Sequence, residues 1–202
     1  MNKRLFLLIL ILPVSMGLLA QVSFTGGLRG GVVTSQVSGD GLAGWNRFGY
    51  GAGAYVEMGF SDEHSVTMEM LYLTKGSRKP ADPDNGDYNT FSMNFSYVEV
   101  PLTYNLKRGV FQFDLGAYAG VLLSSDIEFN GAEYPVEPAF NSTDIGITGG
   151  VHWLAGEHLT FNLRGSSSLL PIRPAPNPVQ QFSYYEKGQY NQVLALLLGY
   201  RF

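Results

Sequence analysis

The chain has 202 residues, a formal net charge of −4 at neutral pH, 15% charged residues and no cysteine. Its length suits one domain, its acidic balance gives no sign of nucleic-acid binding, and the lack of cysteine excludes disulfide bonds and a cysteine-linked lipid anchor. Charged residues are sparse compared with a typical soluble domain, in which they make up about a quarter of the residues.

The first 20 residues are laid out like a secretory signal peptide. Lys3 and Arg4 precede a short apolar run at 5–12, and Ala20 supplies the small residue at the expected cleavage point. A membrane anchor is the weaker alternative, because the run is short and a proline and a glycine follow it. We therefore expect a signal peptide at 1–20 and one exported domain at 21–202.

Beyond this segment, apolar residues recur at every second position, which is the period of a β-strand. In the segment 110–124, for example, Phe111 and Phe113 share one face, and Gln112 and Asp114 share the other. Eight strands are predicted in this way, at about 22–35, 48–60, 65–75, 91–106, 110–124, 143–155, 159–169 and 190–202. No later apolar run is long enough for a transmembrane helix, so a membrane location would require these strands.

The connections between the predicted strands alternate in length. Those at 61–64, 107–109 and 155–158 are tight, whereas the others are long and rich in Gly, Pro, Asn and Asp. Up-and-down membrane barrels have this asymmetry, with short turns on the periplasmic side and long loops outside. An even number of strands places both termini on the short-turn side, where the last strand closes against the first.

Alternation alone leaves open which face points inward. A soluble barrel, such as a lipocalin, has its apolar face inside, and a membrane barrel has it outside. Aromatic residues near the tight turns favour the membrane, because such residues form interfacial girdles: Phe60, Tyr104, Phe111, Trp153, Phe161 and Tyr200. The opposite face carries charges of both signs, which can pair inside a narrow barrel: Arg29, Glu57, Glu69, Glu99, Asp114, Asp144, Arg164 and Arg201. The predicted fold class is all-β, an eight-stranded antiparallel up-and-down transmembrane β-barrel.

Two stretches carry a family resemblance. The C-terminal strand resembles the signal that outer-membrane barrels present to the barrel assembly machinery, through Leu194, Leu196, Leu198, Tyr200 and Phe202. The stretch SYVEVPLTYNL, with Glu99 and Pro101, resembles a strand of the PorT-like outer-membrane β-barrel proteins of Bacteroidetes-type bacteria. The overall plan is similar to the OmpA/OmpX class. The resemblance implies a domain in the outer membrane of a Gram-negative bacterium, with both termini periplasmic and outer-membrane lipid around it.

No catalytic constellation is expected. Two of the three histidines, His64 and His158, fall in tight turns, and His152 lies near the tight-turn end of its strand. The glutamates are better explained as ion-pair partners in the lumen than as acid–base catalysts. We predict no catalytic, cofactor or metal residues, although the acidic stretch from Asp82 to Asp87 leaves calcium binding open.

The most favoured function is a structural or interaction role through the long extracellular loops, in the envelope, in adhesion or as an accessory of a secretion or gliding machine. The PorT-like resemblance implies a partner in the envelope or in a secretion or gliding machine. The alternatives are a narrow channel for small solutes, a lipid-modifying enzyme and a soluble periplasmic ligand-binding barrel. A barrel this narrow is filled with side chains and is not expected to be a general porin.

Overall fold

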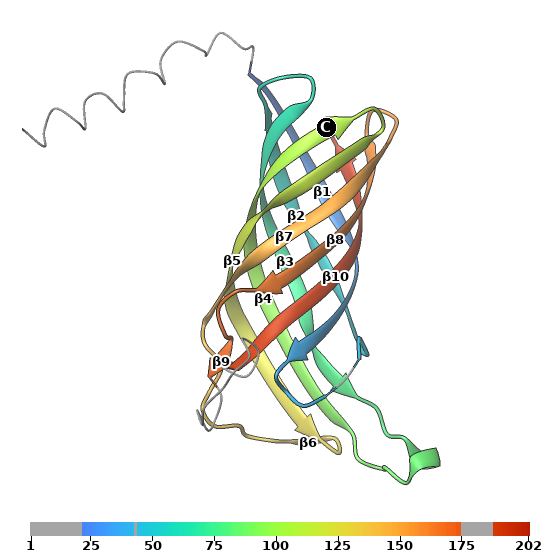
Figure 1. Cartoon of the computed structure of the whole chain (residues 1–202), viewed down its shortest axis with the longest axis vertical. Helices are drawn as coiled ribbons and strands as arrows, with labels where there is room; N and C mark the ends of the chain where they lie inside the picture. Colours follow the sequence, from blue (N-terminus) through green and yellow to red (C-terminus); the bar gives the residue numbers. More distant parts are fainter. Residues whose placement is uncertain (1–21, 43, 175–187) are drawn as a thin grey trace, which may run out of the picture.

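A computed structural model describes residues 22–42, 44–174 and 188–202. Eight long antiparallel strands form a closed barrel (Figure 1): β1 (Ser23–Ser38), β2 (Arg47–Gly59), β3 (His64–Lys79), β4 (Phe91–Arg108), β5 (Phe111–Phe129), β7 (Thr143–Ala155), β8 (Leu159–Ser168) and β10 (Gly188–Arg201). Each pairs with the next, and β10 closes the barrel against β1 in a register that runs from Gly27 opposite Arg201 to Ser38 opposite Tyr190. The predicted fold class is confirmed.

Two short strands and one turn lie at the loop end. The strand β6 (Ala132–Glu133) pairs with β5, β9 (Arg173–Pro174) pairs with β10, and the 3-10 turn η2 covers Pro83–Asn85. Tight turns join β2 to β3, β4 to β5 and β7 to β8, at the end of the barrel where the C-terminus lies (Figure 1). The described parts of the long connections lie at the opposite end. The signal peptide predicted at 1–20 lies outside the described residues.

Three strands run further toward the loops than predicted. The strands β1, β3 and β5 end at Ser38, Lys79 and Phe129, where the sequence predicted ends at 35, 75 and 124. The prediction was wrong because the stretch from Gly76 to Lys79 is polar and has the composition of a loop. It nevertheless pairs with the start of β4, with Lys79 opposite Phe91. The loop between β3 and β4 is therefore shorter than expected.

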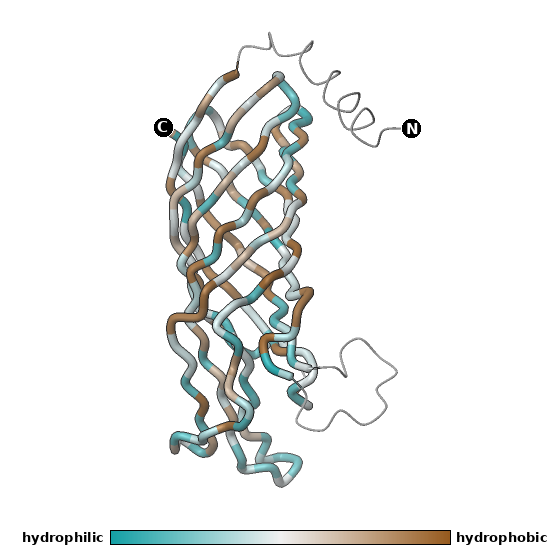
Figure 2. The backbone as a smooth tube through the Cα atoms, turned by 90° about the vertical axis from the view of Figure 1, so that its left-hand side faces the viewer, coloured by the Kyte–Doolittle hydropathy of each residue, from teal (hydrophilic) through white to brown (hydrophobic). Residues whose placement is uncertain are grey.

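The outer face of the barrel is apolar. Large side chains that point away from the lumen are widely exposed, among them Phe24 at 70% and Leu115 at 69%. The tube in Figure 2 alternates between hydrophobic and hydrophilic residues along the strands and becomes mostly hydrophilic at the loop tips. An apolar band with polar residues inside is typical of transmembrane barrels. In the part of the chain that the structure describes, no helix is long and apolar enough to cross a membrane.

The strand β4 contains a proline in the middle of its ladder with β3. Pro101 is buried on the inner face, and the ladder between β3 and β4 is interrupted there, between the Met68–Leu102 and Leu71–Glu99 pairs. Proline cannot donate a backbone hydrogen bond to a ladder, so it is tolerated where pairing is broken. Pro101 therefore faces the lumen next to an unpaired position.

Candidate functional site in the barrel lumen

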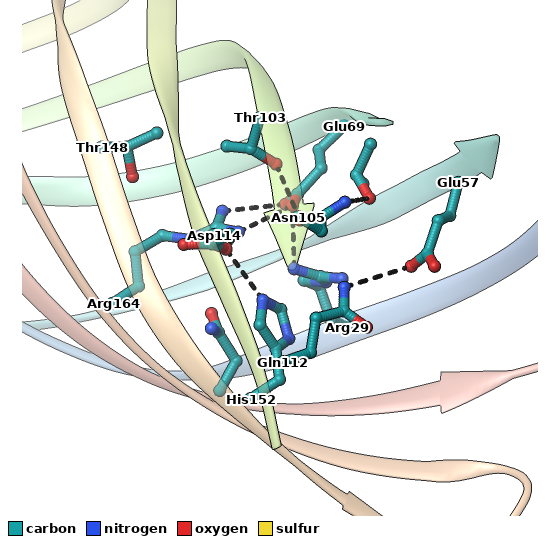
Figure 3. Close-up of polar contacts among 12 residues, drawn as sticks. Arg29, Glu57, Glu69, Thr103, Asn105, Gln112, Asp114, Thr148, His152 and Arg164 are labelled. Carbon is teal, nitrogen blue, oxygen red and sulfur yellow. Dashed lines mark hydrogen bonds and ion pairs between the residues drawn. The ribbon is translucent and has the colours of Figure 1, made fainter. Parts of the chain in front are cut away.

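The part of the lumen toward the tight turns holds a charged group that we name the central cluster: Arg29, Glu69, Asp114, His152 and Arg164 (Figure 3). Arg164 forks onto Glu69, with Nη1 to Oε2 at 3.0 Å and Nη2 to Oε1 at 2.8 Å. The same Nη2 donates to Asp114 Oδ2 at 2.9 Å, and Arg29 Nη1 donates to Glu69 Oε1 at 2.8 Å. Forked arginine–carboxylate bonds of this kind are strong and fix orientation.

The strand register explains why these side chains meet. Asp114 on β5 and Arg164 on β8 both lie opposite Gly150 on β7, and all three point inward. A Cβ at Gly150 would lie 2.6 Å from the carbonyl oxygen of Leu163, so no larger residue fits there without movement. The glycine thus leaves the space across which the aspartate and the arginine bind each other.

A second group, the lysine cluster, lies further toward the loops and consists of Lys75, Glu99, Tyr118, Asp144 and Asn191. The ammonium of Lys75 donates to Glu99 at 2.5 Å and to Asp144 at 2.7 Å. Asn191 Nδ2 donates to Asp144 at 2.8 Å. The lysine side chain is fully buried, and its Nζ lies 4.2 Å from the centroid of the Tyr97 ring. Buried charges of this kind are tolerated only when they are paired and hydrogen-bonded.

Every side chain predicted to face the lumen lies on the inner face, and the structure divides these side chains among three sites. Glu69, Asp114, Arg29 and Arg164 belong to the central cluster, and Glu99 and Asp144 to the lysine cluster. Glu57 and Arg201 form a partly exposed pair at 3.5 Å near the tight-turn mouth.

Sequence reasoning missed an inner lysine and an inner histidine that form ion pairs. Lys75 was placed at the end of its strand, and His152 was not included among the lumen residues, although its Nε2 lies 2.8 Å from Asp114. The signal for both was available, because each shares the parity of other inward residues on its strand.

At the loop end the lumen is closed by an apolar group, the apolar cap: Val37, Met93, Phe95, Tyr97, Ile127 and Ile172. The ring of Phe140, from the loop between β5 and β7, packs on Phe95 with centroids 4.7 Å apart. Arg173 ties the two neighbouring loops together, because its guanidinium donates to the carbonyl oxygens of Glu137 and Pro138 at 2.7 Å each. The loops therefore pack on the end of the barrel.

The predicted interfacial aromatics lie near the tight turns. Trp153 stacks on Phe161 at 5.3 Å between centroids, Tyr200 stacks on His158, and the Tyr104 hydroxyl lies 2.6 Å from His64 Nδ1. Phe60 and Phe111 lie at the same end, at the turns that follow β2 and precede β5. The residues of the predicted assembly signal, Leu194, Leu196, Leu198, Tyr200 and Phe202, are exposed on the outer face.

A second aromatic group at the loop-side edge of the apolar band was not predicted. Phe48 is 72% exposed there, and the rings of Tyr50 and Tyr72 lie 6.0 Å apart. A girdle at each edge is what membrane barrels have, and the alternation already placed these rings outward.

The acidic stretch from Asp82 to Asp87 forms a closed turn around η2. Asn85 Nδ2 donates to Asp82 Oδ2 at 2.8 Å, and Lys79 forms an ion pair with Asp87. Among the residues that the structure describes, no group of three or more His, Cys, Asp or Glu side chains is placed to hold a metal ion. The turn is thus held by its own side chains.

Solved structures share this fold. The attachment invasion locus protein Ail of Yersinia pestis is 14% identical, with 89% of this chain and 99% of Ail covered and a TM-score of 0.51. The neisserial surface protein A, NspA, is 12% identical, with 90% and 99% covered and a TM-score of 0.51. At these identities the likeness concerns the fold alone. Comparison with curated protein sequences gives no match.

The sequence itself matches a family model described as an outer membrane protein beta-barrel domain, over residues 16–173. This match covers most of the chain, and it agrees with the closed eight-stranded barrel and its apolar outer band. The chain belongs to this family of integral outer-membrane β-barrels.

Proposed function

We propose that the protein is a closed barrel that anchors a loop surface in the outer membrane, where the loops contact a protein partner of the envelope or of a secretion or gliding machine. The loops face the outside of the cell and both termini face the periplasm. The observation that carries the proposal is that two ion clusters cross the lumen and an apolar cap covers its loop end, while the loop end is built out beyond the apolar band.

Three layers of side chains support a non-conducting lumen. The central cluster and the lysine cluster cross it, and the apolar cap covers its loop end. Between the two clusters, a void lined by residues that include Glu99, Tyr118 and Arg164 has a volume of about 10 Å³. That is room for about one water molecule. A solute channel would need the ion pairs to separate, which leaves buried charges without partners.

The loop end has the features of a binding platform. The strands β3, β4 and β5 continue past the outward aromatics, with pairs such as Lys79–Phe91 and Phe91–Phe129. The tip between β3 and β4 is held by η2 and by the Lys79–Asp87 ion pair. Functional residues are commonly carried on loops that a rigid scaffold positions.

Orientation can be tested with single cysteines, because the natural chain has none. Tyr88→Cys lies at the loop end and Val110→Cys in a tight turn, and both positions are exposed, at 73% and 53%. In intact cells a membrane-impermeant maleimide should label the first and not the second, and permeabilised cells should label both. Labelling of Val110→Cys alone in intact cells would reverse the orientation.

The interaction can be tested with the same variant. A cleavable crosslinker on Tyr88→Cys should capture a discrete protein that is absent when Val110→Cys carries the crosslinker. The purified barrel should show no steady conductance in planar bilayers. Conductance that changes when Glu99→Gln is introduced, together with no specific crosslinked protein, would favour the narrow channel instead.

A further inference from the structure

A polar pocket of about 280 Å³ lies on the loop-end surface, where β2 begins and β3 ends. Its lining includes Arg47, Arg78, Ser92, Asn94 and Glu128. The strand pairs place Arg78 opposite Ser92, and Ser92 opposite Glu128, so these three residues form one row across β3, β4 and β5. Neither the ion clusters of the lumen nor the apolar cap uses these side chains.

The two arginines of this pocket have no carboxylate partner in the part of the chain that the structure describes. Arg47 donates through Nη1 to the carbonyl oxygen of the adjacent Phe48, while its Nε is buried without a hydrogen-bond partner. Arg47 and Arg78 line the same pocket, so their like charges repel each other. Two neighbouring guanidinium groups and an unsatisfied N–H favour an anion between them.

The pocket lies at the level expected for lipid headgroups. Phe48 precedes the outward Tyr50 on β2, and this aromatic group marks the loop-side edge of the apolar band. On β4 the outward residues change from Val98 to Ser96 and Asn94 at the same edge. Charged side chains just beyond such an aromatic girdle meet headgroups rather than acyl chains.

The chemistry favours one kind of headgroup. A phosphate monoester carries about −1.5 to −2 charges at neutral pH, enough to neutralise two arginines. Guanidinium groups bind phosphate oxygens in pairs, and the hydroxyl of Ser92 and the amide of Asn94 lie in the same pocket. Glu128 is two strands from Arg78, or about 10 Å along the row, so its carboxylate suits a hydroxyl or amine on the same headgroup.

We propose that this arginine pocket binds the phosphate monoester of a lipid headgroup in the leaflet that faces the loops. The arginines hold the phosphate, and Ser92 and Asn94 donate to its remaining oxygens. Phe48 contacts the part of the acyl chains nearest the headgroup. The site fixes a lipid to the wall of the barrel and does not depend on whether the loops bind a protein.

The test uses the full barrel in lipid nanodiscs of phosphatidylcholine, a phosphodiester, with a minor share of phosphatidic acid, a phosphomonoester. Native mass spectrometry measures how much of each lipid stays bound. We expect preferential retention of phosphatidic acid, reduced about tenfold in Arg47→Gln/Arg78→Gln, which corresponds to about 1.4 kcal/mol. Arg78→Lys, which keeps the charge but loses the fork, should lie between. The heat shift on unboiled gels checks that each variant is folded.

Lys107→Gln provides the matched control, because it removes one positive charge at the tight-turn end. Lys107→Gln should retain as much phosphatidic acid as the wild type, whereas Arg78→Gln, which also removes one positive charge, should retain less. An equal loss in this control would show that overall charge attracts the lipid and would overturn the site, as would a double arginine variant that binds like the wild type. If inorganic phosphate binds the lipid-free barrel as tightly as phosphatidic acid does, the pocket is an anion site and the lipid assignment is wrong.

Discussion

The two ends of β4 present the same faces to the lumen and to the outside, yet their chemistry is reversed. Toward the tight turns, the inward residues are polar, as at Glu99, Thr103 and Asn105, and the outward residues are apolar: Val98, Val100, Leu102 and Tyr104. Toward the loops, the inward residues Met93, Phe95 and Tyr97 are apolar, and the outward residues are polar: Ser92, Asn94 and Ser96. The reversal falls where the register with β5 shifts, between Ser96 and Tyr97.

The reversal shows which solvent lies outside each half. Where lipid surrounds the barrel, apolar side chains point outward and the narrow lumen accepts paired charges. Where hydrated headgroups and water surround it, the same strand buries its apolar face, as a soluble sheet does. The switch on β4 therefore marks the loop-side edge of the membrane, and the β-bulge at that point is a common device for changing the course of a strand.

The largest effect should come from the lysine cluster. Lys75→Ala leaves Glu99 and Asp144 buried without their cation, which costs about 3–5 kcal/mol of unfolding free energy. Urea unfolding from lipid bilayers measures it. Replacing all three charges together, as Lys75→Met with Glu99→Gln and Asp144→Asn, should recover most of the loss. If Lys75→Ala is as stable as the wild type, the buried charges of the lumen are solvated and the prediction is wrong.

The apolar cap should come next. Phe95→Ala removes a ring that packs against Tyr97 and Phe140, and truncation of a buried phenylalanine costs about 3 kcal/mol or slightly more. This half of β4 lies outside the apolar band. We therefore expect Phe95→Ala to speed hydrogen exchange of the backbone amides around Phe140 more than that of the amides around Asp114, relative to the wild type. Uniformly faster exchange along the barrel would show that the cap is not a separate unit.

One face of β4 offers a direct test of the membrane edge. Leu102→Arg puts a charge into the apolar band and should cost about 2 kcal/mol or more, whereas Asn94→Arg on the same face should cost about zero. The difference between the two free energies of unfolding from bilayers is the measurement. Similar costs at both positions would place the edge of the membrane elsewhere.

The smallest effect concerns the exposed ion pairs at the two ends. The Arg108 guanidinium, through its hydrogen bond, lowers the pKa of Glu63 in a tight turn, and Lys79 lowers the pKa of Asp87 in a loop in the same way. A lowered carboxyl pKa gives stability that is present above the unfolded pKa and is lost as the pH falls through the folded pKa. In Arg108→Gln, NMR titration of the Glu63 carboxyl carbon should show a higher pKa, with Asp87 unchanged. An unchanged Glu63 pKa would contradict the ion pair.

Local sequence patterns predicted most of the fold. Strict alternation in β5 and β10 gave the strands, their faces and the tight turns, because a side chain on a strand can point only inward or outward. The prediction lost accuracy at the loop ends of β1, β3 and β5, where polar composition suggests loop and only pairing with a neighbour reveals strand. Lys75 was missed for this reason, since it lies at that uncertain end.

The sequence by itself determined that eight strands alternate, that charges of both signs lie on one face and that aromatics gather near the tight turns. Only the tertiary structure decided which charges bind one another. Glu69 and Arg164 are 95 positions apart, and Lys75 and Asp144 are 69 apart. Periodicity fixes the direction of a side chain, but the register between strands and the closure of the barrel fix its height and its neighbour.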